Sequence, residues 1–534
     1  MRGDVHHFGS SGALLARVAL AALLLSLGAC PVGPNFKKPE VALNPAWSKS
    51  GDTRLSAQAK SDGRWWQTFH DPVLDHLIEL AYRQNLPLQI AGLRIMEARA
   101  RLGIAKGKQF PQAQEIFAGV SAVGIPDSVA SAVGFNRNLA AYQLGFDAAW
   151  EFDLWGKYRR GVQSELANLM ATMADYYGAL VSLNAEVART YAEVRTYQTL
   201  IELAEQNVGI QEDSLRIAES RFRNGATSEL DVTQASSLLE STRASIPQLR
   251  ASLQQTENAL STLLGQPTGS VDGLLGDAHE IPQAPSTVSV SVPTEMLRRR
   301  PDIRSAELMA EAQCARIGVA KSELYPSFSL AGAFGLWGNT TGIGSHNLFS
   351  ADSIFYFVGP RFNWPVLNYG RLTNNVRVED ARFQQALVHY RDTVIRAAQE
   401  VEDALSGFVL SQDALGALEQ SVSAAQRSQE IASVQYREGA VDFQRVLDAQ
   451  RFLLQQQNRL TELRSSVATN LIALYKALGG GWESRIDQPV VPERMKKEME
   501  DRTNWGDLLS ERPPAPRNQV QPAGSTAATA PRGK

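Results

Sequence analysis

The chain has 534 residues, a formal net charge of −3 and a sequence pI of about 6.2. This near-neutral balance gives no indication of nucleic acid as a partner, because nucleic-acid-binding surfaces are strongly basic. The only two cysteines are Cys30 and Cys314, so an exported form of the chain has no internal disulfide framework.

The first 30 residues have the features of an export signal. Arg17 precedes an apolar run at 18–27, which ends in Leu-Gly-Ala before Cys30. The run is too short to cross a bilayer core of roughly 30 Å. It resembles a bacterial lipoprotein signal, which implies cleavage before Cys30 and lipidation of its thiol; an ordinary secretory signal with an incidental cysteine is the alternative. No later stretch approaches 18 uninterrupted apolar residues, which excludes a helical membrane protein.

The next segments change from a helical period to a period of two. Residues 88–106 carry a helical pattern. Residues 112–124 and 142–155 are rich in glycine and aromatic residues and alternate loosely, as outer-membrane barrel strands do. The Gly/Asn/Ser-rich connector 125–141 predicts a loop. Hairpins of a soluble sheet are the alternative for these strands.

A proline-free stretch between Gly156 and Gly225 predicts one long helix. Steps of four and three from Tyr176 to Phe222 meet apolar residues at twelve of 14 positions, which indicates a coiled-coil seam. Such a helix would be about 105 Å long, which argues against ordinary amphipathic helices in a compact protein. Gly225 suits the helix end, and heptad-like sequence then returns to Leu264.

The whole pattern is then repeated. A shift of 214 positions places residues 142–265 on 356–479 without a gap, and a shift of 215 pairs Pro111 with Pro326. Because this period is far longer than the roughly 20–50 residues of a solenoid unit, it indicates a duplicated half-molecule. The second copy predicts a helix at 302–321, strands at 326–338 and 354–367, a loop at 339–353, and a long helix with a seam from Tyr390 to Tyr436 that ends at Gly439.

Four strands per chain cannot close a membrane barrel alone. The smallest bacterial single-chain barrels have eight strands, and open edges in lipid leave backbone groups without hydrogen bonds. Either these strands lie outside the membrane or several chains share one barrel. A shared barrel continued by long helices is a tube.

Several ordered motifs resemble the OprM/NodT-type outer-membrane efflux lipoproteins, a branch of the TolC family. They are CPVGPNFKKPE from residue 30, WWQTFHDPVLDHLI at 65–78, the segment 297–330, and YREGAVDFQRVLDAQR at 436–451. The resemblance implies a mainly α fold with β: a homotrimer with a shared twelve-stranded barrel and a coiled-coil tunnel in the periplasm. It also implies a periplasmic adaptor and an inner-membrane pump, usually of the resistance–nodulation–division class, as partners.

The resemblance places the two glycine turns at the pump-proximal end, as contacts for the adaptor. The alternative is that these turns only end helices. The residues concerned are Arg221, Phe222, Gly225 and Ala226 in the first half, and Tyr436, Arg437, Gly439 and Ala440 in the second.

The resemblance also implies that Asp448 faces inward at a constricted tunnel end, where three copies form an acidic ring. Its repeat-mate is Gln234, so one half alone carries the charge. A solvated carboxylate on an outer face is the alternative. Where relatives carry a second acid this chain has Arg445, whose repeat-mate is Asp231. We hypothesise that Arg445 pairs with Asp231 or Asp448 and helps to hold the tips closed.

No catalytic, metal or cofactor site is expected. His70 and His76 flank Asp71 and Asp75, but a spacing of six puts the two histidines on different faces of a helix. No Walker A or nucleophile-elbow pattern is present, so energy must come from a partner.

The predicted function is therefore an outer-membrane efflux duct, passive and supplied with small solutes by a pump. A type I protein-secretion duct is the alternative, and a structural envelope lipoprotein without conductance is a third. The predicted organisation is a signal peptide at 1–29, an equatorial segment with a short helix at 30–111, strands at 112–155, a helical hairpin at 156–265, a linker at 266–296, a short helix at 297–325, strands at 326–368, a second hairpin at 369–482, and an equatorial segment with a disordered tail at 483–534.

Overall fold

A computed structural model describes residues 31–56, 63–124, 126–133, 137–276, 280–290, 293, 299–339 and 348–509. The predicted signal, Cys30 and the tail 511–534 lie outside these residues. The chain divides into two compact units, which we describe separately. The first contains Met1–Pro39, Glu97–Ala171 and Ala306–Tyr390, and the second contains Glu40–Met96, Thr172–Ser305 and Arg391–Lys534.

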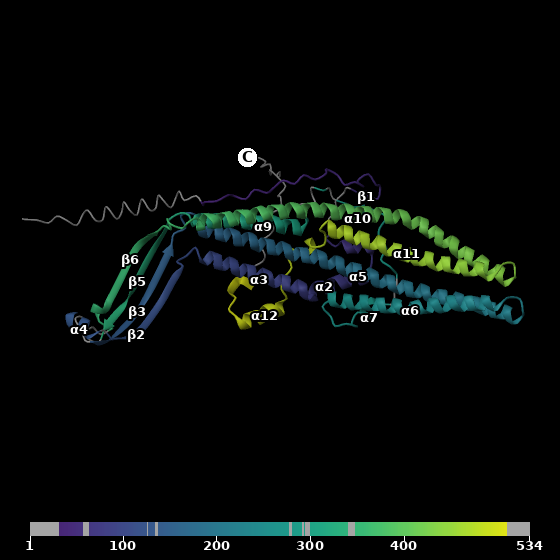
Figure 1. Cartoon of the computed structure of the whole chain (residues 1–534), viewed down its shortest axis with the longest axis horizontal. Helices are drawn as coiled ribbons and strands as arrows, with labels where there is room; N and C mark the ends of the chain where they lie inside the picture. Colours follow the sequence, from purple (N-terminus) through teal and green to yellow (C-terminus); the bar gives the residue numbers. More distant parts are fainter. Residues whose placement is uncertain are drawn as a thin grey trace, which may run out of the picture. The chain divides into compact units, whose positions relative to one another are not determined.

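The first unit contains a four-stranded antiparallel sheet (Figure 1). Its order is β2-β3-β5-β6, so each half of the chain contributes one adjacent pair. The connector predicted as a loop between the first two strands instead contains helix α4, Asp127–Val133, whose first turn bonds back to the carbonyl of Pro126. The strands are β2 Ala113–Gly124, β3 Asn138–Glu151, β5 Ser327–Asn339 and β6 Ile354–Asn363.

The two faces of this sheet differ in chemistry. On one face a row of directly paired residues crosses all four strands, and it consists of Ile116, Phe146, Phe334 and Tyr356. All four side chains are exposed, between 44% and 81%. The neighbouring row on the opposite face begins with Glu115 paired to Asp147. The first row is therefore entirely apolar while the neighbouring row carries charge, which is the alternation of a membrane barrel strand.

The long helices match in length between the halves. α5 Lys157–Arg223 and α10 Arg371–Arg437 have 67 residues each, and α6 Glu229–Leu263 and α11 Phe443–Ala477 have 35 each. The predicted seam positions of α5 are buried or half-buried from Tyr176 to Ala218. None of the described helices is both long and apolar enough to cross a membrane.

The remaining described elements are shorter. Asp71, which follows His70, caps α2 by accepting hydrogen bonds from the backbone of Val73 and Leu74. It also accepts one from the Tyr191 hydroxyl at 2.7 Å. These bonds give it a structural role. The remaining elements are α2 Pro72–Gln84, α3 Leu86–Gly107, α7 Asp272–Leu275, α9 Pro301–Ser322, α12 Glu493–Arg502, the paired strands β1 Leu55–Ser56 and β4 Val288–Ser289, and the 3-10 turns Trp65–Phe69, Ala351–Ser353, Glu483–Arg485 and Gly506–Leu509.

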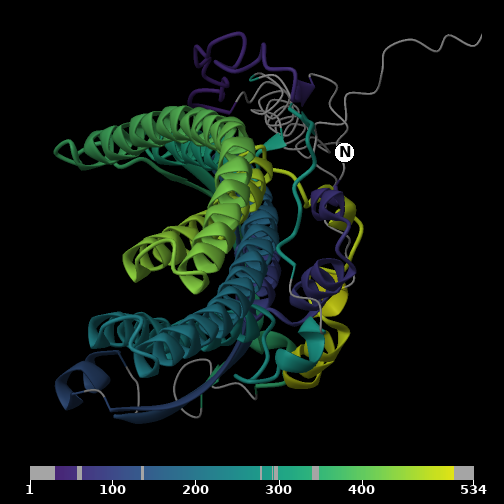
Figure 2. The ribbon, with the colours of Figure 1, turned by 90° about the vertical axis from the view of Figure 1, so that its right-hand side faces the viewer.

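In the second unit, each long helix forms an antiparallel hairpin with the helix that follows it (Figure 2). A matched ion pair marks the same register in both hairpins: Arg250 to Glu205 at 2.8 Å and Arg464 to Glu419 at 2.9 Å. These pairs are repeat-mates. Because all four side chains are about half exposed, each pair contributes little stability. The matched pairs show instead that the two hairpins have the same register.

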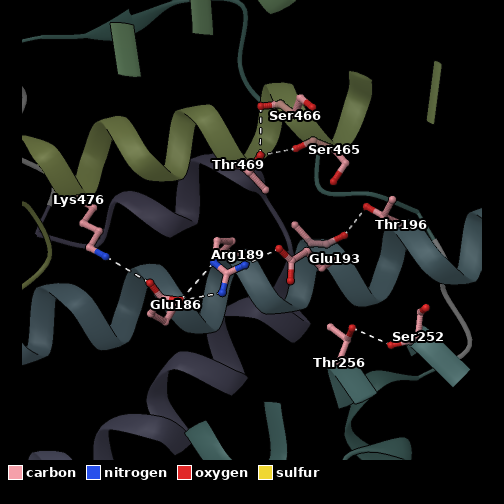
Figure 3. Close-up of polar contacts among 11 residues, drawn as sticks. Glu186, Arg189, Glu193, Thr196, Ser252, Thr256, Ser465, Ser466, Thr469 and Lys476 are labelled. Carbon is pink, nitrogen blue, oxygen red and sulfur yellow. Dashed lines mark hydrogen bonds and ion pairs between the residues drawn. The ribbon is translucent and has the colours of Figure 1, made fainter. Parts of the chain in front are cut away.

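The two hairpins also meet along α5 and α11, which run side by side in Figure 3. Lys476 of α11 pairs with Glu186 of α5 at 3.2 Å. Farther along, Asn207 donates to Gln457 at 2.8 Å. Residue numbers fall on one helix as they rise on the other, so α5 and α11 are antiparallel with a fixed register.

Candidate functional site

The far ends of both hairpins are closed by the same turn. Gly225 donates to the carbonyl of Phe222 at 2.9 Å and Ala226 donates to that of Arg221 at 2.8 Å. In the second half, Gly439 and Ala440 repeat these bonds to Tyr436 and Gln435. Each turn is a Schellman motif, with its glycine in the left-handed region at φ +70° and +79°.

Arg221 connects the two tips. Its Nη1 donates to the carbonyl of Tyr436 at 2.5 Å and to that of Arg437 at 3.2 Å. Its guanidinium also lies 4.8 Å from the centroid of the Tyr436 ring, a cation–π contact. The repeat-mate of Arg221 is Gln435, so the halves are not equivalent here and the first hairpin holds the second.

Tyr436 forms the second link. Its hydroxyl donates to Asp231 of α6 at 3.1 Å, and its ring meets Phe443 edge-on at 5.2 Å. The side chain is only 2% exposed, and this burial raises the pKa of the Tyr436 hydroxyl above its usual value. The surrounding buried cluster draws on both hairpins and comprises Ala218, Ala235, Leu238, Tyr436, Phe443, Val446 and Leu447.

The structure therefore brings together Arg221, Tyr436 and Asp231, but not the pair that we hypothesised from sequence. Asp231 accepts from Tyr436 and from the Thr227 hydroxyl. Within one chain, no ion pair between described residues joins Arg445 to Asp231 or Asp448. Arg445 and Asp448 are exposed on α11, and Asp448 accepts from Gln444 at 2.8 Å.

The other predicted tip residues lie at the surface. Phe222 is 43% exposed, although its repeat-mate Tyr436 is buried. Arg437 offers an exposed side chain, while its carbonyl bonds Arg221. Gly225, Ala226, Gly439 and Ala440 are also exposed. The surface of the tips is thus made of the turns themselves, Phe222 and the side chain of Arg437.

Sequence reasoning missed a buried polar layer just above this cluster. Asn207 of α5 bonds Gln457 of α11, and Gln450 of α11 donates to Ser214 of α5 at 2.6 Å. Gln211 lies between them and is 2% exposed. The only sequence signal was the break in the apolar seam at Gln211.

The comparisons with known proteins decide the family. A family model described as "Outer membrane efflux protein" matches residues 77–266 and again 292–480. The chain belongs to the outer membrane efflux protein family. The double match also confirms the duplication, because one model fits each half at nearly the same spacing as the repeat.

Curated relatives of this family member match over nearly their whole length. Nodulation protein T of Rhizobium leguminosarum bv. trifolii is 30% identical over 458 residues, covering 86% of this chain and 96% of that protein. The pyoverdine export outer membrane protein OpmQ of Pseudomonas putida is 31% identical over 473 residues, covering 88% and 98%. These relatives are named for export and nodulation rather than for a catalysed reaction.

Solved structures show the same architecture. The outer-membrane channel OprN matches with a TM-score of 0.78 and 31% identity, covering 85% of this chain and all of that one. CusC matches with a TM-score of 0.72 and 27% identity, covering 85% and 100%. The fold is thus that of TolC-like channels, and the chain is the outer-membrane channel component of a tripartite efflux system. Protein secretion, the alternative, is not favoured by these relatives.

Proposed function

We propose that three copies of this chain form one duct, and that solutes pass through it when the helical tips part. The observation that carries the proposal is the four-stranded sheet. Among the described strands, β2 and β6 each have one edge without a partner. In lipid such an edge leaves backbone groups without hydrogen bonds. Three sheets joined edge to edge close a twelve-stranded barrel with the apolar face outward.

A second observation comes from the repeat-mates on the long helices. Ile395 and Leu410 of α10 are 59% and 56% exposed, whereas their mates on α5, Val181 and Thr196, are 6% and 9% exposed. The two helices have the same length and equivalent positions in the repeat. An apolar side chain that is exposed while its repeat-mate is buried indicates a surface that is covered in the assembly, so this face of α10 is the surface that a second copy covers.

The tip contacts are the closing device in this proposal. Arg221 and Tyr436 hold one hairpin against the other, and Asp231 accepts from Tyr436. Arg445 and Asp448 are exposed in the single chain, so they are available to a neighbouring copy. Asp448 contributes the acidic ring, and Arg445 pairs with Asp231 or Asp448 of an adjacent chain.

The proposal extends to the localisation and the partners of the duct. Cys30 carries the lipid anchor in the outer membrane, and the helical tunnel lies in the periplasm. The exposed turns, with Phe222 and Arg437, contact a periplasmic adaptor, which connects the duct to an inner-membrane pump of the resistance–nodulation–division class. The solutes are small and drug-like or toxic, and the pump selects them. The duct needs no cofactor.

Two measurements test this function. Light scattering of the detergent-solubilised protein should give a mass of three chains, and planar-bilayer recording should show ion current. Ile395→Asp should disrupt the trimer, because it places a charge at an apolar position on the covered face of α10. Gln426→Asp, exposed on another side of α10, should not. A monomer, or a trimer without current in any state of the tips, would contradict the proposal and favour a structural lipoprotein.

The anchor and the partner are tested separately. Cys30→Ser should release the protein from the outer-membrane fraction or reduce its labelling by radioactive palmitate. Capture of a periplasmic adaptor by the intact protein should weaken when Phe222→Ser alters the exposed tip. An unchanged distribution and unchanged capture would remove these two assignments without affecting the duct.

A further inference from the structure

The register of α5 against α11 places a polar side chain opposite an apolar one in the seam that holds the hairpins together. Asn207 bonds Gln457 and Ser214 bonds Gln450, so the paired residue numbers sum to 664 in both cases. Gln211 lies on the same face of α5, four residues after Asn207 and three before Ser214. The same sum places Gln211 opposite Leu453, which is itself 2% exposed.

Gln211 therefore presents an amide to an aliphatic side chain. Both its Oε1 and its Nε2 are buried, and neither has a hydrogen-bond partner among the described residues. A buried amide without partners destabilises the state in which it is buried, because its bonds to water are lost and not replaced. The neighbouring amides are satisfied, so the defect is confined to one position.

The second half of the chain lacks this defect. The repeat-mate of Gln211 is Ala425, which is 3% exposed, and the mate of Leu453 is Leu239, also buried. At this helical position the second half therefore buries an apolar residue where the first half buries an amide. The polar residue stands in the half whose Arg221 holds the opposite tip.

We propose that Gln211 is a built-in destabiliser of the closed tip. While the hairpins lie together, the Gln211 amide has no hydrogen-bond partner, and when they part, water can bond to it. The stability of the closed state therefore depends on the contacts of Arg221 and Tyr436. This inference rests on the proposed function, since it requires that the hairpins part in use. It assigns the balance between closed and open states to a side chain that is buried between α5 and α11.

The test uses the full-length protein with Gln211→Leu, which keeps the side-chain volume and faces Leu453. Gln211→Ala, the residue of the other half, is the second variant in case leucine packs poorly. Gln206→Leu is the matched control, because Gln206 is exposed on the same helix. Thermal unfolding in detergent and single-channel open probability in planar bilayers are measured for each, both in the wild type and in a Tyr436→Phe background, where the tip is loosened.

Gln211→Leu should raise the unfolding temperature by a few degrees and lower the open probability about tenfold, the change expected when one buried amide loses its unmet hydrogen bonds. Gln206→Leu should change neither. A lower unfolding temperature with a leakier channel would overturn the inference, because Gln211 would then hold the seam. A higher unfolding temperature with unchanged open probability would also overturn it, because the effect would be on stability alone. If the wild type passes no current, the duct function fails, and the unfolding temperatures by themselves decide whether Gln211 destabilises the seam.

Discussion

The hydrogen bond between Tyr436 and Asp231 depends on a single oxygen atom, the Tyr436 hydroxyl. Tyr436→Phe keeps the ring against Phe443 at 5.2 Å and below Arg221 at 4.8 Å, but it deletes the 3.1 Å hydrogen bond to the Asp231 carboxylate. A hydrogen bond to a charged group contributes about 1.5–3 kcal/mol. Because Thr227 still donates to Asp231, the lower end of this range applies, and the closed-to-open ratio should fall by about tenfold per chain.

Planar-bilayer recording measures this change as a longer open time and a larger mean conductance. The matched control is Tyr197→Phe on α5, since Tyr197 has no hydrogen bond to another described residue and is half-buried. A Tyr436→Phe channel whose open time stays within about twofold of the wild type would refute the reasoning, because the expected effect is at least 1.4 kcal/mol. An equal effect in both variants would refute it as well.

Three further predictions concern the same tip. Arg221→Lys should lengthen the open time about fivefold, because lysine keeps the charge but cannot both stack on Tyr436 and bond two carbonyls; an unchanged open time would contradict this. The hydrogen bond from Tyr436 to Asp231 should be fully present below pH 10, the ordinary tyrosine pKa, and should be lost as pH rises through the raised pKa of Tyr436. The channel should therefore open at alkaline pH, and this opening should be weaker in Tyr436→Phe. Identical pH profiles of the wild type and the variant would contradict this prediction. Gly225→Ala and Gly439→Ala should each lower stability by about 1–2 kcal/mol, seen in thermal unfolding, since both glycines have positive φ; no loss in either variant would mean that the turn relaxes.

The long elements could be predicted from sequence because their periodicity is sustained. The predicted helix between Gly156 and Gly225 corresponds to α5, Lys157–Arg223, since a heptad seam and a terminal glycine define both its length and its end. Helix α4 was not predicted, because seven residues are too few to establish a helical period within a Gly/Asn/Ser-rich connector.

The contacts of the tip could be predicted only in part. The repeat mismatch identified Asp231 and the turn motif identified Arg221 and Tyr436, but their meeting depends on which hairpin lies against which. The hypothesised partner of Asp231 was Arg445, whereas within one chain Tyr436 takes that position. The unpaired amide of Gln211 could not be predicted either, because a polar residue in a seam can be interpreted only once the residue opposite it is known.

The equal lengths of the paired helices restrict the insertions and deletions that the long helices can accept. With 67 residues in α5 and α10, and 35 in α6 and α11, both turns end at the same level relative to their matched ion pairs. An insertion of one heptad in α5 alone would move one turn about 10 Å past the other and break every contact of Arg221. A longer or shorter tunnel therefore requires four coordinated changes, two in each half. Length variation in such ducts should occur in whole heptads in all four helices, or else outside them.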